Sequence, residues 1–133
     1  MKSVLPIFLL FFVISITGCN YFTSEKDIIG EWKYMEIETL HEDPKDKISS
    51  KELQKLSPSI IFSEQGDLKI IWDEKMLSTG KYVLEGNIIR FTEKLPDGKT
   101  RQFPFLIVEI NDQTLKFQTM VQDATIVTAK RIK

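Results

Sequence analysis

The fold is decided by the stretch Thr79-Gly80-Lys81-Tyr82-Val83-Leu84-Glu85-Gly86-Asn87-Ile88-Ile89-Arg90-Phe91-Thr92-Glu93. Apolar residues alternate with polar ones on both sides of a short central break, which is the period of a β-strand with one buried face. Gly86 and Asn87 in the break tolerate positive φ angles, as a tight turn requires. The stretch therefore predicts a β-hairpin.

The same pattern recurs along the chain at a spacing of roughly ten residues, which is typical of antiparallel β-sandwiches and barrels. No helical period is long enough for a βαβ unit. We expect strands over residues 28–40, 59–63, 68–73, 79–84, 88–93, 101–110, 114–121 and 124–132. Because closing a sheet removes its exposed edges, the predicted fold class is all-β, an eight-stranded antiparallel up-and-down barrel.

Two segments interrupt the strand pattern. The polar stretch 41–56 ends in residues 49–56, where a serine precedes Leu53 and Leu56, and this predicts one short helix in the first long loop. Pro104 lies inside the predicted strand 101–110 and indicates an edge, a bulge or a bend there. The motif Pro96-Asp97-Gly98-Lys99 predicts a hairpin just before that strand.

Composition narrows the class of protein. The 133 residues predict one domain, and 42% hydrophobic with 28% charged residues is typical of a globular chain. A formal net charge of −1 provides no general attraction for nucleic acid. A single cysteine excludes an internal disulfide, a zinc–cysteine cluster and a CxxC redox site.

The N-terminus has the features of an export signal. Lys2 is the only charge before Glu25, and residues 4–17 form an uncharged, mostly apolar run. As a helix this run would span about 21 Å, against about 30 Å for the hydrocarbon core of a bilayer. We therefore expect a cleaved secretory signal peptide and not a membrane span.

The end of this run, Ile16-Thr17-Gly18-Cys19, resembles the lipobox of bacterial lipoproteins. The resemblance implies a signal peptide over 1–18, a lipid on the Cys19 thiol, a lipidated N-terminus and tether over 19–27, and a barrel domain over 28–133. Two or three acyl chains anchor a protein stably to a membrane. Because Asn20 is not the aspartate of the inner-membrane retention signal, we expect the outer membrane of a bacterial envelope. The alternative is an ordinary signal peptide with a chance cysteine.

The remainder of the chain resembles small lipocalin-like bacterial lipoproteins. Gly30-Glu31-Trp32 is similar to the Gly-x-Trp signature of lipocalins, and three later phrases match the family in order and spacing: residues 60–66, 79–87 and 105–117. The resemblance implies that Trp32 plugs one end of the barrel and that Arg131, on the last strand, stacks on it. Gly30, Trp32 and Arg131 would then close the barrel, with a cation–π contact adding about 0.5–2 kcal/mol. The alternative is an Arg131 directed to solvent.

Aromatic residues on the predicted strands are the candidates for lining a ligand site. They are Tyr34, Phe62, Trp72, Tyr82, Phe91, Phe103, Phe105 and Phe117. The alternative is that they only fill the core, since the interior of an eight-stranded barrel is just wide enough for side chains or one small ligand.

An acidic cluster surrounds the only histidine: Glu36, Glu38, His41, Glu42, Asp43 and Asp46. The alternation shared with Trp32 and Tyr34 predicts that Glu36 and Glu38 face the barrel interior, where a pocket is needed for acid–base catalysis. The loop lacks the ligand spacing of a calcium site, and we interpret its charges as solvated. We expect no metal, no cofactor and no catalytic residue.

These observations predict a monomeric, membrane-anchored lipoprotein that binds a small apolar ligand and not nucleic acid. The first alternative is a protein–protein interaction module, for example an inhibitor of an envelope or host hydrolase that acts through its 41–56 loop. A hydrolase of envelope components is the third reading. The volume of the interior separates the first two, because pockets that hold drug-sized ligands measure about 300 Å³ or more.

Overall fold

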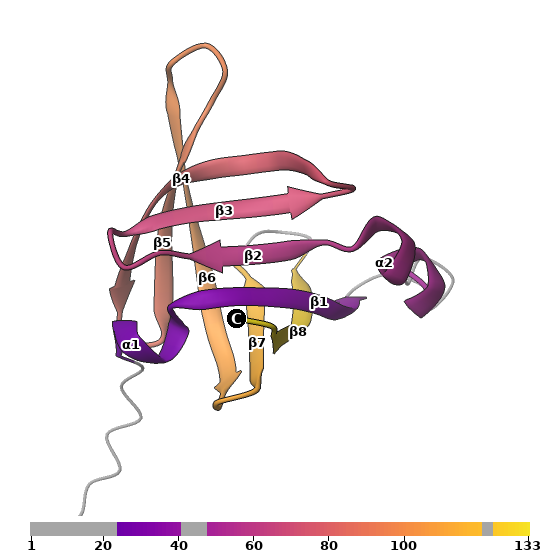
Figure 1. Cartoon of the computed structure of the whole chain (residues 1–133). Helices are drawn as coiled ribbons and strands as arrows, with labels where there is room; N and C mark the ends of the chain where they lie inside the picture. The colour runs from indigo at the N-terminus through magenta and orange to yellow at the C-terminus, as the bar shows by residue number, and fades with distance from the viewer. Residues whose placement is uncertain (1–23, 41–47, 121–123) are drawn as a thin grey trace, which may run out of the picture.

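The computed structural model describes residues 24–40, 48–120 and 124–133, and it confirms the eight-stranded up-and-down barrel (Figure 1). Every neighbouring pair of strands is antiparallel, and the strands follow one another around the barrel in sequence order. They are β1 (Gly30–Thr39), β2 (Ser59–Phe62), β3 (Asp67–Trp72), β4 (Lys75–Glu85), β5 (Ile88–Lys94), β6 (Thr100–Ile110), β7 (Thr114–Thr119) and β8 (Thr125–Arg131).

The last strand closes the barrel against the first. The pairing of β1 with β8 runs from Trp32 opposite Arg131 to Thr39 opposite Thr125. Every strand of the described barrel therefore has a hydrogen-bonded neighbour on each side, and no long edge is left open to other chains.

The hairpin between β3 and β4 is an addition to the predicted elements, because β4 begins at Lys75 and not at Thr79. Trp72 pairs with Lys75, which leaves Asp73 and Glu74 as a two-residue turn. Both turn residues have positive φ, 52° and 63°, as a type I′ turn requires. The sequence gives little sign of this turn because neither position is Gly or Asn.

Pro104 lies within β6, and the chain accommodates it at a local edge. Its carbonyl accepts a hydrogen bond from the backbone N–H of Met120, one residue past the end of β7. In a strand, the N–H and C=O of one residue point toward the same neighbouring strand. The side on which Pro104 lacks an N–H therefore faces the end of β7, where strand pairing has stopped. The bulge of this strand lies further along, at Val108, between the paired residues Ile107 and Glu109.

Two short helices flank the strands in the part of the chain that the structure describes. The predicted helix is confirmed as α2 (Ser50–Leu56), and the Ser49 hydroxyl accepts a hydrogen bond from the backbone N–H of Glu52. The helix α1 (Glu25–Ile28) was not expected from the sequence, which indicated a tether there. Its last residue, Ile28, is fully buried in the core, so the packed domain begins before β1.

The barrel has two unlike ends, which we call the closed end and the mouth. The closed end carries α1, Arg131 and the turns β2–β3, β4–β5 and β6–β7; the mouth carries α2 and the turns β3–β4 and β5–β6. The β5–β6 hairpin projects well beyond the rest of the barrel (Figure 1). The interior is filled by fully buried side chains, the largest being Trp32, Phe62, Phe91 and Phe117.

Candidate functional site

The closed end is built around Trp32, whose side chain has no exposed surface. Its indole Nε1 donates a 2.8 Å hydrogen bond to the carbonyl of Ile28, at the end of α1. The guanidinium carbon of Arg131 lies 4.1 Å from the centre of the indole ring. The structure thus places an indole beneath a guanidinium where β1 meets β8, within the distance of a cation–π interaction.

Arg131 also ties three segments together by hydrogen bonds. Nη1 donates to the carbonyl of Ile29, Nη2 to that of Asp27 (both 2.7 Å), and Nε to that of Asp112 (2.9 Å). These acceptors belong to α1, the residue after it, and the β6–β7 turn. We call Trp32, Arg131 and the carbonyls they bind the clasp. Its donors satisfy carbonyls that the end of α1 leaves without helical partners.

Gly30 is required by the same geometry. Its φ angle is +137°, which side-chain-bearing residues rarely adopt, and a Cβ there would collide with the carbonyl of Lys133 and the guanidinium of Arg131. The Gly-x-Trp pattern therefore has a physical reason in this chain: glycine leaves room for the cation that covers the tryptophan two residues later.

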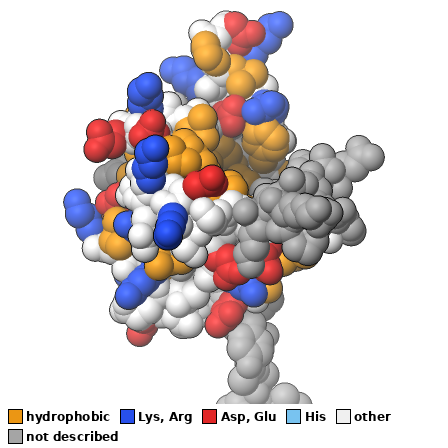
Figure 2. All heavy atoms as spheres, turned by 90° about the vertical axis from the view of Figure 1, so that its right-hand side faces the viewer, with side chains coloured by type: hydrophobic (Ala, Val, Ile, Leu, Met, Phe, Trp, Pro, Cys, Tyr) orange, Lys and Arg blue, Asp and Glu red, His pale blue; other side chains and the backbone are white. Residues whose placement is uncertain are grey.

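An apolar pocket of about 200 Å³ lies at the mouth. Three aromatic rings from β5 and β6 form most of its wall, and one carboxylate lies at its rim. The lining residues are Ile70, Phe91, Glu93, Phe103, Pro104, Phe105 and Thr119. On the face that includes α2 and the β3–β4 turn, hydrophobic side chains gather below the projecting hairpin and charged ones surround them (Figure 2).

Of the eight aromatic residues predicted to line a ligand site, Phe91, Phe103 and Phe105 line the pocket. The rings of Phe91 and Phe105 are stacked with their centres 6.1 Å apart. Phe117 contacts Phe105 from deeper in the barrel, and Tyr34 contacts Phe117 in turn. The remaining three are Phe62 and Tyr82, in edge contact toward the closed end, and Trp72, partly buried against the core.

Sequence reasoning missed four lining residues: Ile70, Glu93, Pro104 and Thr119. A signal for three of them was present, because each alternates with a buried residue on its own strand. Ile70 alternates with Leu68 on β3, Glu93 with Phe91 on β5 and Thr119 with Phe117 on β7.

Glu93 connects the pocket to its surroundings. Its carboxylate accepts a 2.8 Å hydrogen bond from the Ser78 hydroxyl and pairs with the Arg101 guanidinium at 3.0 Å. Arg101 also lies over the ring of Phe103, 4.3 Å from its centre. The rim of the pocket therefore carries one negative and one positive group, Glu93 and Arg101, beside an apolar interior. Side chains from β4 and β6 hold the Glu93 carboxylate in place.

A second, wider groove of about 440 Å³ adjoins the pocket outside the barrel, where β4 and β5 diverge. Glu93 is common to both cavities. Met76 and Leu77 on one wall of the groove are 54% and 65% exposed. Leu95 and Pro96, from the projecting hairpin, form the other wall.

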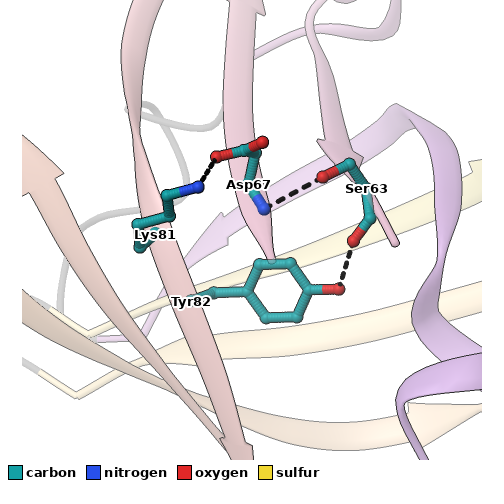
Figure 3. Close-up of polar contacts among 4 residues, drawn as sticks. All are labelled: Ser63, Asp67, Lys81 and Tyr82. Carbon is teal, nitrogen blue, oxygen red and sulfur yellow. Dashed lines mark hydrogen bonds and ion pairs between the residues drawn. The ribbon is translucent and has the colours of Figure 1, made fainter. Parts of the chain in front are cut away.

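A polar cluster at the β2–β3 turn has a structural role (Figure 3). The Ser63 hydroxyl accepts a hydrogen bond from the Asp67 N–H, and the Ser63 carbonyl accepts one from the Tyr82 hydroxyl, both at 2.9 Å. Asp67 pairs with Lys81, and this hydrogen-bonded partner lowers the pKa of the Asp67 carboxyl. Burial, together with the nearby Glu25 and Asp67 carboxylates, raises the pKa of Tyr82.

The buried phenol of Tyr34 lies in the aromatic interior. Burial raises the pKa of Tyr34 far above its usual value near 10, and desolvation is the one cause of the shift. The ring is therefore a neutral member of the core at any ordinary pH.

The prediction that Glu36 and Glu38 face the interior is wrong. A bulge in β1 between Tyr34 and Glu36 reverses the alternation of the strand, so Ile37 points inward opposite the buried Val127 and both glutamates face outward. The other members of the acidic cluster, His41, Glu42, Asp43 and Asp46, lie outside the described residues. Within residues 24–40, 48–120 and 124–133, no group of three or more His, Cys, Asp or Glu residues is placed to hold a metal ion.

Cys19 also lies outside the described residues. In the described part of the chain, no helix combines the length and the apolar character that crossing a bilayer demands. Comparison of the sequence with protein-family models and with curated proteins finds no match.

Proposed function

We propose that this chain is a lipid-anchored envelope lipoprotein whose lipocalin-like barrel binds the apolar end of a small ligand at its mouth, without catalysing a reaction. The observation that carries the ligand proposal is the pocket of about 200 Å³ walled by Phe91, Phe103 and Phe105. An apolar cavity with one polar group at its rim is the usual form of a small-molecule site.

The size of the pocket limits what it accepts. It is smaller than the ~300 Å³ typical of sites that enclose a drug-sized molecule, and fully buried side chains such as Phe62 and Phe117 pack the barrel toward the closed end. The ligand we propose therefore inserts one ring or a short length of acyl chain and leaves its remainder outside, near Glu93 and Arg101.

The test is a titration of the barrel, residues 24–133, with the apolar probe anilinonaphthalene sulfonate, competed by a fatty acid. Ile70→Trp places a large side chain in the pocket and should weaken binding about tenfold, the equivalent of ~1.4 kcal/mol. Val83→Trp is the matched control, since Val83 is exposed on the outer face of β4 and should leave binding unchanged. Equal affinity in both variants would exclude the pocket as the site.

The anchor has its own test. The lipobox supports a diacylglyceryl thioether on Cys19, which the intact mass of the mature chain from bacterial membranes would report. Cys19→Ser removes the thiol that would carry the lipid, so the added mass should be lost. An unmodified Cys19 in the wild-type chain would contradict the anchor.

A second candidate function, a protein-interaction module, is favoured by the groove beside the pocket. Met76 and Leu77 expose large apolar side chains there, and apolar side chains grouped at a groove are typical of partner contacts. A partner recovered with the wild-type chain and with Val83→Asp, but lost with Leu77→Asp, would favour this function over ligand binding.

A further inference from the structure

We propose that the closed end of the barrel faces the membrane that anchors it, and that the mouth opens away from that membrane. This inference rests on the anchor at Cys19 given under the proposed function. It identifies the lipid surface as the partner of the closed end. It also implies that whatever enters the pocket arrives from the aqueous side.

The first step is the place where the described chain begins. Ser24 caps α1, and its backbone N–H and hydroxyl both bond to the Asp27 carboxylate. The carbonyl of Asp27 is in turn held by Arg131. The first described residue is therefore fixed to the clasp, at the closed end of the barrel.

The second step is the length of chain between the anchor and that point. Cys19 and Ser24 are five residues apart, and five residues span at most about 18 Å even when fully extended. A ten-residue strand such as β1 is about 33 Å long, or about 25 Å along the barrel axis at the usual tilt. The connection is too short to run past the barrel wall and bring the mouth to the bilayer.

Charge does not contradict this orientation. Lys26, Lys33, Lys130 and Lys133 lie near the clasp, on α1, β1 and the C-terminal end of the chain, among carboxylates such as Glu25 and Glu31. With both signs present, this end is neither repelled by nor strongly drawn to an anionic surface. Chain length therefore sets the orientation.

The experiment uses the lipidated full-length mature chain in vesicles that contain a headgroup nitroxide quencher. A lipidated Cys19 is a thioether, so a single introduced cysteine is the only free thiol to carry a fluorophore. Gln113→Cys reports from the β6–β7 turn at the closed end, and Lys99→Cys from the projecting hairpin at the mouth; both positions are exposed. We expect the label at position 113 to be quenched several-fold more than the label at 99.

Insertion of twelve Gly/Ser residues after Asn20 provides the control, because a flexible connection of that length lets the barrel turn over. The difference between the two labels should then shrink. Equal quenching at 99 and 113 with the natural tether, or stronger quenching at 99, would overturn the orientation. An intact mass without lipid would instead refute the anchor itself, so the two failures are distinguishable.

Discussion

Arg131 shows how much of the closed end depends on the shape of a single side chain. Its flat guanidinium covers an indole with its face and reaches three carbonyls with its edge. An ammonium is compact and cannot do both. Glycine at position 30 leaves room both for this cation and for the carbonyl of Lys133.

Arg131→Lys should therefore behave as a disruptive substitution. We expect the free energy of unfolding to fall by about 2 kcal/mol, because hydrogen bonds from a charged donor are lost and carbonyls at the clasp lose their partner. Arg90→Lys is the matched control: Arg90 pairs with Glu85 on the exposed surface, and its replacement should cost less than about 1 kcal/mol. Urea denaturation of both variants measures the difference, and equal losses would contradict the importance of the clasp.

Tyr34 predicts how the barrel responds to alkali. Its pKa in the folded state is raised by burial, whereas the unfolded chain ionises near pH 10. The stability that depends on the neutral phenol is therefore complete below pH 10 and is lost progressively above it.

Tyr34→Phe should remove this part of the pH dependence. Unfolding curves between pH 8 and pH 11 should show a shallower loss of stability in Tyr34→Phe than in the wild-type chain. At neutral pH the two should be close in stability, because the ring keeps its edge contact with Phe117. Parallel curves would show that the hydroxyl is in contact with water in the folded state.

Among the elements, the β3–β4 hairpin carries local strain. Asp73 and Glu74 both hold positive φ angles. Aspartate tolerates this conformation, whereas it costs a residue such as glutamate about 1–2 kcal/mol. β4 nevertheless begins four residues before its predicted start. The turn is held in place because β4 pairs with β3 and because the Asp73 N–H donates a hydrogen bond to the Leu56 carbonyl.

Glu74→Gly should relieve the strain and stabilise the barrel by about 0.5–1 kcal/mol, because Asp-Gly suits a type I′ turn. Glu64→Gly, in the β2–β3 turn, is the comparison: φ is not positive at Glu64, and glycine there should be neutral or destabilising. Thermal unfolding of the two variants gives the answer, and a loss of stability in Glu74→Gly would refute the strain.

The elements also show what a sequence pattern can and cannot predict. Strand order, the α2 helix and the hairpin at Gly86 were predictable because alternation, a serine cap and turn residues are local signals. The orientation of Glu36 and Glu38 was not, because one bulged residue, Met35, reverses the alternation without any compositional trace. The mouth pocket was predictable only in part. Alternation places Ile70 and Thr119 on the inward faces of β3 and β7, but it does not show which inward side chains leave a cavity between them.

At the scale of the whole molecule, closure links the two ends of the chain. Arg131 bonds to a carbonyl 102 residues earlier, and every described strand is paired on both sides. Removal of any one strand would therefore leave each of its two neighbours without a hydrogen-bonded partner on one side. Small domains of this kind unfold as a unit.

We expect a single cooperative transition. In Trp72→Phe the remaining fluorescence comes from Trp32 at the closed end, and its midpoint in denaturant should coincide with that of the far-ultraviolet circular dichroism of the whole sheet. In Arg131→Met the fluorescence midpoint and the circular dichroism midpoint should both shift to the same lower denaturant concentration. Separate midpoints would indicate that the closed end melts independently of the rest of the barrel.

The pairing of β8 with β1 has a consequence for biogenesis. A chain still being synthesised has β1 from early on but lacks the strand that pairs with it until β8 has been made, after all the other strands of the barrel. Until then Trp32 has no guanidinium above it, and native closure cannot occur. For a polypeptide proposed to be exported, this order of synthesis favours a nascent chain that stays unfolded, and so able to pass through an export channel, at least until β8 has been made.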